Sequence, residues 1–153
     1  MANAKRKSAH RSARKSTNKS ARKSARRSRS KSKSGARPKA VTVAAIKRAV
    51  EGRDAEALAG MYADDALLLV IDRDNPPSSP RRLTGKAAIS SYFVDVCGRD
   101  VTHMIESGVA SGNRLAFTQS CTYADGTKVF CSAMLDLKSG KIAQQTVVQA
   151  WDG

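Results

Sequence analysis

The sequence predicts an α+β domain over residues 40–153, preceded by a basic tail over residues 1–39. All 13 acidic residues lie beyond position 39, whereas 16 of the 28 Lys and Arg residues lie within the tail. The remainder of the chain is therefore almost neutral, with apolar residues at helical spacing first and in strict alternation after about position 100. Helices followed by a run of alternating strands are typical of an α+β fold.

The tail is predicted to be disordered. No Val, Leu, Ile, Phe, Tyr or Trp occurs between Met1 and Pro38, so the segment has no apolar surface to offset the cost of ordering its backbone. Serine recurs at every fourth position from Ser8 to Ser28, and basic residues then alternate with serine up to Ser34. In composition and period the tail resembles the tails of linker-histone-like and bacterial histone-like proteins, and its end resembles an arginine–serine repeat.

We expect such a tail to bind nucleic acid without sequence preference. Its cations would release counterions from phosphates, and it has no aromatic residue to stack on bases. The alternatives are a localisation signal, another anionic partner or a solubilising role. Serine phosphorylation would weaken the contact with phosphates. The residues expected to contact phosphates are Lys5, Arg6, Lys7, Arg11, Arg14, Lys15, Lys19, Arg22, Lys23, Arg26, Arg27, Arg29, Lys31 and Lys33.

A membrane-spanning or secreted protein is not expected. No run approaches the roughly 18 apolar residues that span a bilayer, and the basic start is not followed by an apolar segment. Three cysteines, an odd number without an export signal, favour an intracellular, reducing compartment, with a nucleoid or nuclear association if the tail binds DNA. An organelle transit peptide would need an apolar helical face, which the basic tail does not have. No His and Cys spacing predicts a metal, and we expect no cofactor.

Three helices are expected before position 100. The first has apolar residues at helical spacing from Val43 to Val50, with Thr42 as its N-cap and Gly52 at its end. Asp54 caps a second, short helix, whose buried face comprises Leu58, Met61 and Tyr62. A third helix opens at Gly85, and its inward residues are Ile89, Tyr92, Phe93 and Val96.

Strands account for the rest of the domain. Residues 67–71 form an apolar strand that we expect to be buried on both sides, and residues 72–84, with three prolines, are expected to form a loop. Four antiparallel strands follow, separated by turn dipeptides such as Asp125-Gly126, at residues 101–110, 114–124, 127–137 and 141–151. Long strands of this kind curl, so the helices should close the concave side into a cone.

Three segments resemble the nuclear transport factor 2-like superfamily, in particular its SnoaL-like and ketosteroid isomerase-like branches. They are Gly52 to Leu58 with Met61-Tyr62-Ala63-Asp64-Asp65-Ala66, then Leu83-Thr84-Gly85-Lys86-Ala87-Ala88-Ile89, and then Ser139-Gly140-Lys141-Ile142. The resemblance covers about residues 43–151. It implies a cystatin-like α+β barrel, in which a curved antiparallel sheet wraps around three N-terminal helices, and it implies a homodimer formed through the sheet.

The resemblance also implies positions for an isomerase centre, which needs a tyrosine, a general base and a protonated acid. These fall at Ile46, Val70 and Ala133, or at Ser132 if the turn is counted differently, and none of these residues supplies the chemistry. Other candidates for proton transfer are Tyr62, Asp72 and His103. His103 is interpreted more simply as an exposed residue at the start of a strand.

The strand alternation and the resemblance together predict a mostly apolar pocket. Its lining residues are expected to be Tyr62, Tyr92, Phe93, Phe117, Gln119, Cys121, Cys131, Ala133, Gln145 and Trp151. The alternative is a collapsed core, in which Gln119 bonds a neighbouring strand and both cysteines are small buried thiols.

Three functions are compatible with these features. The leading hypothesis is a small-molecule-pocket or dimerisation domain of SnoaL-like type, without the isomerase catalytic residues, which the tail tethers to nucleic acid without sequence preference. The first alternative is a SnoaL-like or isomerase-like enzyme acting on a small apolar carbonyl compound. The second is a scaffold protein whose tail is a localisation signal.

Overall fold

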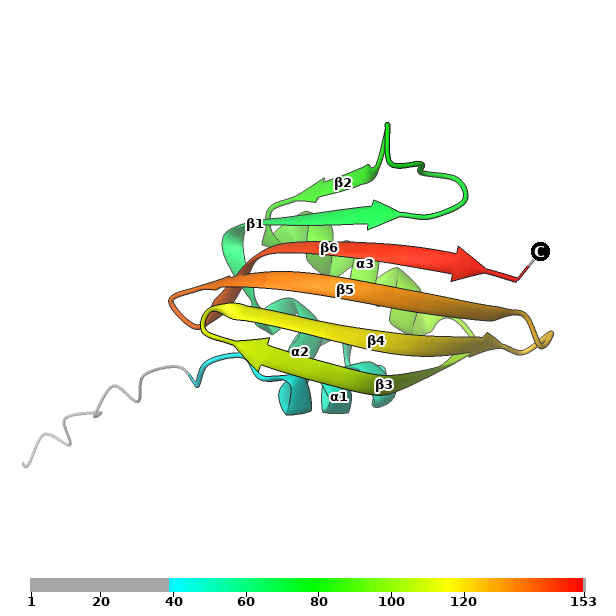
Figure 1. Cartoon of the computed structure of the whole chain (residues 1–153), viewed down its shortest axis with the longest axis horizontal. Coiled ribbons are helices and arrows are strands. Elements are labelled where there is room, and N and C mark those ends of the chain that lie inside the picture. Colours follow the sequence, from blue (N-terminus) through cyan, green and yellow to red (C-terminus); the bar gives the residue numbers. More distant parts are fainter. Residues whose placement is uncertain (1–38, 153) are drawn as a thin grey trace, which may run out of the picture. The chain divides into compact units, whose positions relative to one another are not determined.

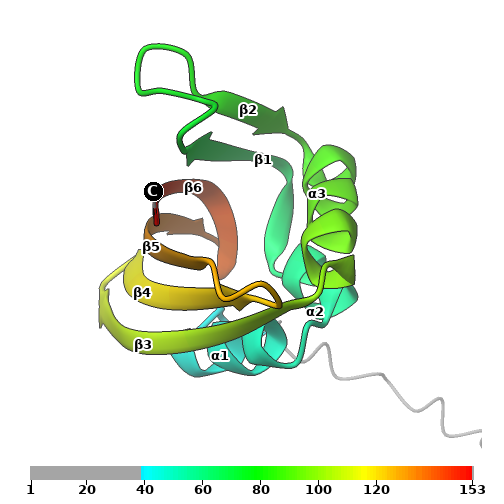
Figure 2. The ribbon, with the colours of Figure 1, turned by 90° about the vertical axis from the view of Figure 1, so that its right-hand side faces the viewer.

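The computed structural model describes residues 39–152, so the predicted tail lies outside the described residues except for Lys39. Three helices and one curved, unclosed sheet of six strands make up this part of the chain (Figure 1). The helices cover the concave face of the sheet (Figure 2). The predicted α+β class is therefore confirmed. The elements, in chain order, are α1 (Val43–Glu51), α2 (Ala55–Gly60), β1 (Tyr62–Ile71), β2 (Arg81–Thr84), α3 (Lys86–Gly98), β3 (Val101–Ser111), β4 (Arg114–Tyr123), β5 (Lys128–Lys138) and β6 (Lys141–Trp151).

The helices begin where their caps predict. The Thr42 hydroxyl accepts a hydrogen bond from the Ala45 backbone N–H at 3.1 Å, and the Asp54 carboxylate accepts one from the Ala57 N–H at 2.8 Å. Such contacts satisfy N–H groups that have no partner within the helix. The second helix is shorter than predicted, however. It ends at Gly60, so Tyr62 begins β1 instead of lying on the helix. None of the described helices is both long and apolar enough to cross a membrane.

The sheet has the strand order β2-β1-β6-β5-β4-β3. The four-stranded antiparallel meander from β3 to β6 is confirmed. Two features of the sheet edge formed by β2 and β1 were not predicted. β1 runs parallel to β6, and Arg81–Thr84, part of the predicted loop, forms β2 against β1. The first joins segments that are distant in the sequence, and the second is a strand of only four residues, too short to show an alternating pattern.

The strand β1 shows that only one face of the sheet is fully buried. Ala66, Leu68 and Val70 are at most 2% exposed, whereas Leu67 and Leu69, which point to the opposite face, are half-buried. Our expectation of a strand buried on both sides was therefore wrong. The helices pack on the concave face, and no described element covers the outer one (Figure 2).

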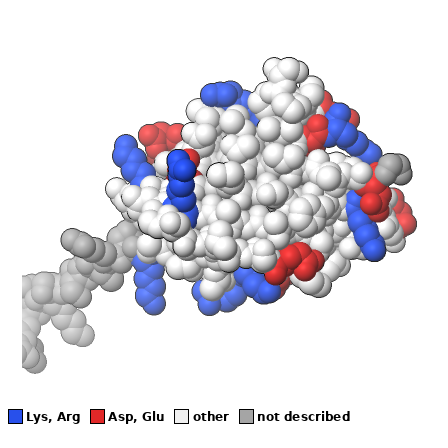
Figure 3. Space-filling view, in the orientation of Figure 1, with Lys and Arg blue, Asp and Glu red and all other residues white. Residues whose placement is uncertain are grey.

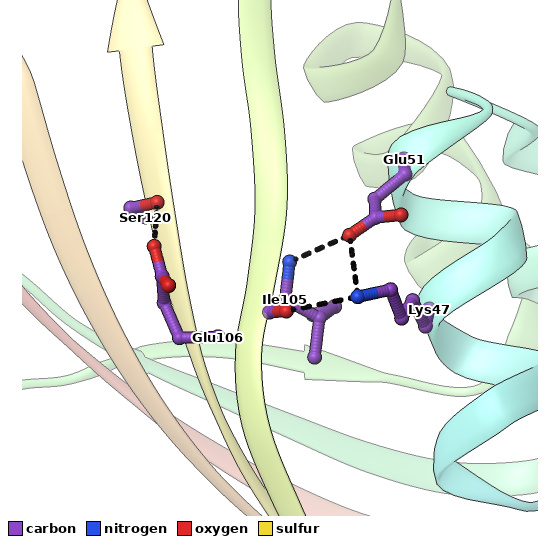
Figure 4. Close-up of polar contacts among 5 residues, drawn as sticks. All are labelled: Lys47, Glu51, Ile105, Glu106 and Ser120. Atoms are coloured by element: carbon purple, nitrogen blue, oxygen red, sulfur yellow. Dashed lines mark hydrogen bonds and ion pairs between the residues drawn. The ribbon is translucent and has the colours of Figure 1, made fainter.

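The edge strand β3 is fastened to α1 at a bulge between Ile105 and Ser107 (Figure 4). The Ile105 N–H donates to Glu51 Oε1 at 3.0 Å, and Lys47 Nζ donates to the Ile105 carbonyl at 3.3 Å. Lys47 and Glu51 also form an ion pair of 3.4 Å. These contacts satisfy backbone groups that a sheet edge would otherwise leave unpaired.

Candidate functional site

A cavity of about 380 Å³ lies between the concave face of the sheet and the helices. Residues from all three helices and from β1, β3, β4, β5 and β6 line it. Every residue that we predicted for a pocket is among them except Ala133, which is 1% exposed and belongs to the packed core beneath the cavity lining. The three candidates for proton transfer, Tyr62, Asp72 and His103, also line the cavity.

One polar pair is buried deep in the cavity wall. The Tyr62 hydroxyl donates a hydrogen bond to Gln145 Oε1, and these residues are 3% and 7% exposed. Phe93 packs against the Tyr62 ring with centroids 5.6 Å apart. Burial, reinforced by the neighbouring Tyr92, raises the pKa of Tyr62. The Tyr62 phenol is therefore a neutral hydrogen-bond donor at physiological pH, and not a base.

A second polar group lies where β3 and β4 pair. His103 sits directly opposite Cys121, with His103 Nδ1 3.3 Å from Cys121 Sγ. The side-chain nitrogen of Gln119 lies 3.0 Å from both of these atoms. His103 is half-buried, and its Nε2 atom is buried without a hydrogen-bond partner among the described residues. The interpretation of His103 as an exposed residue was therefore wrong.

The Cys121 thiol is acidic in this setting. The neighbouring Cys131 thiol makes the largest contribution, and contacts with His103 and Gln119 add to it. Together they outweigh burial and lower the pKa of Cys121 to about 5. The Cys121 neighbour, together with burial, raises the pKa of Cys131. Cys121 is thus the more acidic of these two thiols.

The polar end of the cavity is formed by the loop after β1. Asp72 Oδ1 accepts hydrogen bonds from the backbone N–H groups of Asp74 at 2.9 Å and Asn75 at 2.8 Å. This carboxylate oxygen therefore holds the loop in shape. Arg73 is exposed and lies over the Trp151 ring, 4.5 Å from its centroid. Such a stack places a cation beside an aromatic wall of the cavity.

Tyr92, on α3, faces the same end of the cavity. Arg81 lies 5.3 Å from the centre of its ring. Burial is the main reason that the pKa of Tyr92 rises to about 12, and the nearby Cys131 adds to the rise. Tyr92 is therefore a second neutral phenol in the cavity wall.

The positions that the resemblance implies for an isomerase centre carry no ionisable side chain. Ile46 and Val70 line the cavity, and Ala133 lies in the core. Within residues 39–152, no group of three or more His, Cys, Asp or Glu side chains is arranged to hold a metal ion. The cavity wall presents two neutral phenols, the amides of Gln119 and Gln145, the His103 imidazole and the Cys121 thiol, and its polar end adds carboxylates and guanidinium groups such as Asp72 and Arg81.

Sequence reasoning named His103 and Cys121 but not their contact. The bulge at Glu106 creates it. Between the hairpin turn and the bulge, Gly108 lies opposite Phe117, whereas beyond the bulge His103 lies opposite Cys121. The extra residue therefore turns His103 to the concave face, because side chains alternate along a strand. Apart from the polar Glu106-Ser107 pair, no signal in the sequence marks this bulge.

Three solved structures show the same fold. A proposed ketosteroid isomerase from Kribbella flavida is 20% identical, with a TM-score of 0.58, and the match covers 72% of this chain and 74% of that chain. A proposed polyketide cyclase from Sinorhizobium meliloti is 18% identical, with a TM-score of 0.53 and coverages of 67% and 88%. An uncharacterised protein with a cystatin-like fold from Silicibacter pomeroyi is 15% identical, with a TM-score of 0.59 and coverages of 71% and 72%.

No curated protein sequence matches the chain significantly. A family model does match, and its description is SnoaL-like domain. The match extends over residues 43–145, from the start of α1 into β6, and so includes every element that lines the cavity except the second half of β6. The chain therefore belongs to the SnoaL-like domain family.

Proposed function

We propose that this SnoaL-like domain binds a small, largely apolar carbonyl compound in its cavity, forms a homodimer through its sheet, and is held on nucleic acid by its basic tail. The cavity of about 380 Å³ carries the proposal. Its volume lies in the range usual for small-molecule sites, about 300–1,000 Å³, and such sites combine an apolar lining with a few fixed polar groups.

The polar groups in the wall favour a ligand that accepts hydrogen bonds. Two phenols with raised pKa values, Tyr62 and Tyr92, remain protonated at physiological pH. A carbonyl oxygen is an acceptor that a phenol can approach, and the aromatic lining suits a planar ring system. The proposed ketosteroid isomerase and polyketide cyclase among the similar structures are consistent with ligands of this class.

A panel of steroids and aromatic polyketides tests the cavity by ligand-induced thermal shift. A ligand at about 100 times its Kd stabilises the folded state by about 2.7 kcal/mol. We expect Gln145→Leu to reduce the shift, because Gln145 orients Tyr62 in the wall. Gln144→Leu is the matched control, since Gln144 is exposed and does not line the cavity. Equal shifts in the two variants would contradict the proposed site.

The outer face of the sheet supports a homodimer. Its exposed apolar residues alternate with small polar ones, and they are Met104, Val109, Phe130, Met134 and Val148. Charged side chains gather around the rim of this face, and its centre is largely uncharged (Figure 3). An exposed apolar area surrounded by polar residues is typical of an interaction surface.

Two variants with equal exposure test the dimer. Met134 on β5 and Val94 on α3 are each 62% exposed. Met134→Glu places a charge in the centre of the outer sheet face and should give a monomer by light scattering. Val94→Glu places the same charge on a helix surface and should leave the dimer intact. A dimer that survives Met134→Glu would show that this face is not the interface.

The tail provides the nucleic-acid contact in this proposal. Positions 1–39 contain sixteen Lys and Arg residues and no Asp or Glu. The logarithm of the affinity should fall with the logarithm of the salt concentration, with a slope of roughly −0.9 for each phosphate contacted. Two tails in a dimer would raise the affinity further. A nucleoid or nuclear location in a reducing compartment follows if the nucleic acid is DNA.

Deleting residues 1–38 tests the tether separately from the cavity. Retention on a phosphate-mimicking column should disappear, whereas the melting temperature and the thermal shift caused by a cavity ligand should not change. Retention that persists at moderate salt after the deletion would remove the tail from the proposal.

A catalytic role is the second candidate, and the position of His103 favours it. Its Nε2 atom is buried at the cavity and has no partner among the described residues, so it could exchange a proton with a bound carbonyl compound. Tyr62 would then act as a hydrogen-bond donor, and Asp72 would shape the loop. If a ligand of the panel is turned over, His103→Ala should abolish turnover. Full activity in that variant would exclude His103 from the reaction.

A further inference from the structure

Two polar side chains converge on one sulfur atom inside the cavity. His103 Nδ1 and the Gln119 side-chain nitrogen lie 3.3 Å and 3.0 Å from Cys121 Sγ. The Cys131 thiol on β5 is a further neighbour, which increases the acidity of Cys121. All four side chains line the cavity. A buried thiol that served only to fill space would need no such partners, because free cysteine packs as a small apolar residue.

Cys121 also differs from the other two cysteines of the chain. The pKa of Cys121 is lowered to about 5, whereas the pKa of Cys131 is raised by Cys121 and by burial. Burial also raises the pKa of Cys97, which lies near the end of α3. Because the thiolate is the nucleophile, the cavity holds one reactive sulfur beside two inert ones.

The position of His103 gives this sulfur a proton carrier. Its Nδ1 atom faces Cys121 Sγ, and its buried Nε2 atom has no partner within residues 39–152. A nucleophile within reach of a base that a third group orients is the arrangement that activates side chains for covalent chemistry. Gln119, 3.0 Å from His103 Nδ1, is that third group.

We propose that Cys121 captures an α,β-unsaturated carbonyl compound in the cavity by conjugate addition, with His103 carrying the proton. The proposal rests on the proposed binding of a small carbonyl compound and specifies the class of that compound. A thiolate is a soft, polarizable nucleophile, and the conjugated carbon of such a compound is a soft electrophile. The aromatic cavity wall provides a surface for its planar conjugated system.

The atoms and electrons of the step balance within the site. The Cys121 thiol gives its proton to His103, and a sulfur lone pair then forms a bond to the β-carbon of the ligand. The π electrons of the carbon–carbon double bond move towards the carbonyl oxygen and give an enolate. His103 returns the proton to the α-carbon. The product is a thioether of the saturated carbonyl compound, and no oxidant or reductant is consumed.

The experiment treats the full-length protein with cyclohex-2-enone near neutral pH and follows each cysteine by peptide mass spectrometry. We expect Cys121 to be modified about tenfold or more faster than Cys97 or Cys131, in line with their thiolate fractions. The urea-unfolded chain is the reference, and all three cysteines should react there at similar rates. His103→Ala should slow the modification of Cys121 by about 100-fold, the lower end of what a general acid contributes, because the variant cannot return a proton to the α-carbon.

His103→Gln provides a second variant, which fills the position with a hydrogen-bonding side chain but cannot carry a proton. It should be slowed like His103→Ala. Modification of Cys121 no faster than that of Cys97, or an unchanged rate in both His103 variants, would overturn the proposal. Binding is measured separately on the natural chain, because a panel ligand without a conjugated double bond can stabilise it without forming an adduct. If panel ligands stabilise the protein but cyclohex-2-enone forms no adduct with Cys121, only the covalent capture is contradicted. If no panel ligand stabilises the protein, the proposed binding in the cavity is contradicted as well.

Discussion

The two faces of the sheet are built from alternating residues of the same strands, yet they differ in chemistry. The concave face is apolar but contains paired polar groups, such as Tyr62 with Gln145 and His103 with Cys121. The outer face is apolar at its centre and has its charges around the rim (Figure 3). A mostly apolar surface with a few fixed polar groups is the composition usual for small-molecule sites, in line with the ligand that we propose for the concave face. The outer face is suited to a large, complementary surface.

Two neighbouring leucines of β1 test this comparison most strongly. Leu68 is 1% exposed on the concave face, whereas Leu69 is half-buried on the outer face. Leu68→Ala should lower the free energy of unfolding by about 2–5 kcal/mol, because it leaves a cavity in a packed core. Leu69→Ala should lower the free energy of unfolding by about half as much as Leu68→Ala does. Urea unfolding at concentrations where the chain is monomeric provides the measurement. Equal costs would mean that the chain itself covers its outer face.

Alkaline pH tests the concave face through its two buried phenols. The pKa of Tyr92 is raised to about 12 and that of Tyr62 is also raised, both mainly by burial. Unfolded tyrosine loses its proton near pH 10, so above that pH the unfolded chain binds fewer protons than the folded one. Below pH 10 the free energy of unfolding should therefore not depend on these two groups. Above pH 10 it should fall by about 1.4 kcal/mol per pH unit for each tyrosine.

Denaturant unfolding at pH 9, 10 and 11, values chosen around the usual tyrosine pKa of about 10, measures this decline. Tyr92→Phe removes one of the two titrating groups and should reduce the slope above pH 10 by about half. A slope that does not change in this variant would show that Tyr92 ionises alike in the folded and unfolded chains.

The Tyr62–Gln145 pair tests how far the concave face depends on paired polar groups. Tyr62→Phe should lower the free energy of unfolding by about 1–3 kcal/mol, because it leaves the Gln145 carbonyl oxygen buried without its hydrogen-bond donor. Gln145→Leu should cost a similar amount for the converse reason. The double variant should be more stable than the sum of the two costs predicts, since it removes both partners. Strict additivity in a urea-unfolding cycle would contradict a direct interaction.

The sequence predicted the elements of the meander well, because their turns and alternation are local signals. Each predicted strand from β3 to β6 ends within one residue of its observed bounds, and Thr42, Asp54 and Gly85 cap their helices as expected. The features that it did not predict are non-local. The parallel contact of β1 with β6 depends on a partner far away in the chain, and the short strand β2 forms only by pairing with β1 across the loop that joins them.

The site was predictable in its membership but not in its contacts. Alternation along β4, together with the family resemblance, placed Phe117, Gln119 and Cys121 on the concave face, where the structure also places them. The contact between His103 and Cys121 depends instead on the bulge at Glu106, which turns His103 inward. One extra residue in a strand reverses the direction of every side chain beyond it. A pattern of period two cannot locate such a residue when the flanking positions are both polar.

The smallest effect that we predict concerns the contact that fastens this bulge. Glu51 Oε1 accepts the Ile105 N–H from one side of β3, and Glu106 accepts the Ser120 hydroxyl on the other at 2.5 Å (Figure 4). Glu51→Ala should lower the free energy of unfolding by about 0.5–1.5 kcal/mol, as expected for the loss of one partly exposed hydrogen bond.

Glu51→Gln separates the hydrogen bond from the ion pair with Lys47. Its amide oxygen can still accept the Ile105 N–H, but the charge that pairs with Lys47 is lost. A half-exposed ion pair contributes little to stability. We therefore expect the free energy of unfolding of Glu51→Gln to lie within about 0.5 kcal/mol of that of the natural chain. If Glu51→Gln instead loses as much stability as Glu51→Ala, the charge and not the backbone contact holds the edge strand. The orientation of His103 towards the cavity would then depend on salt concentration.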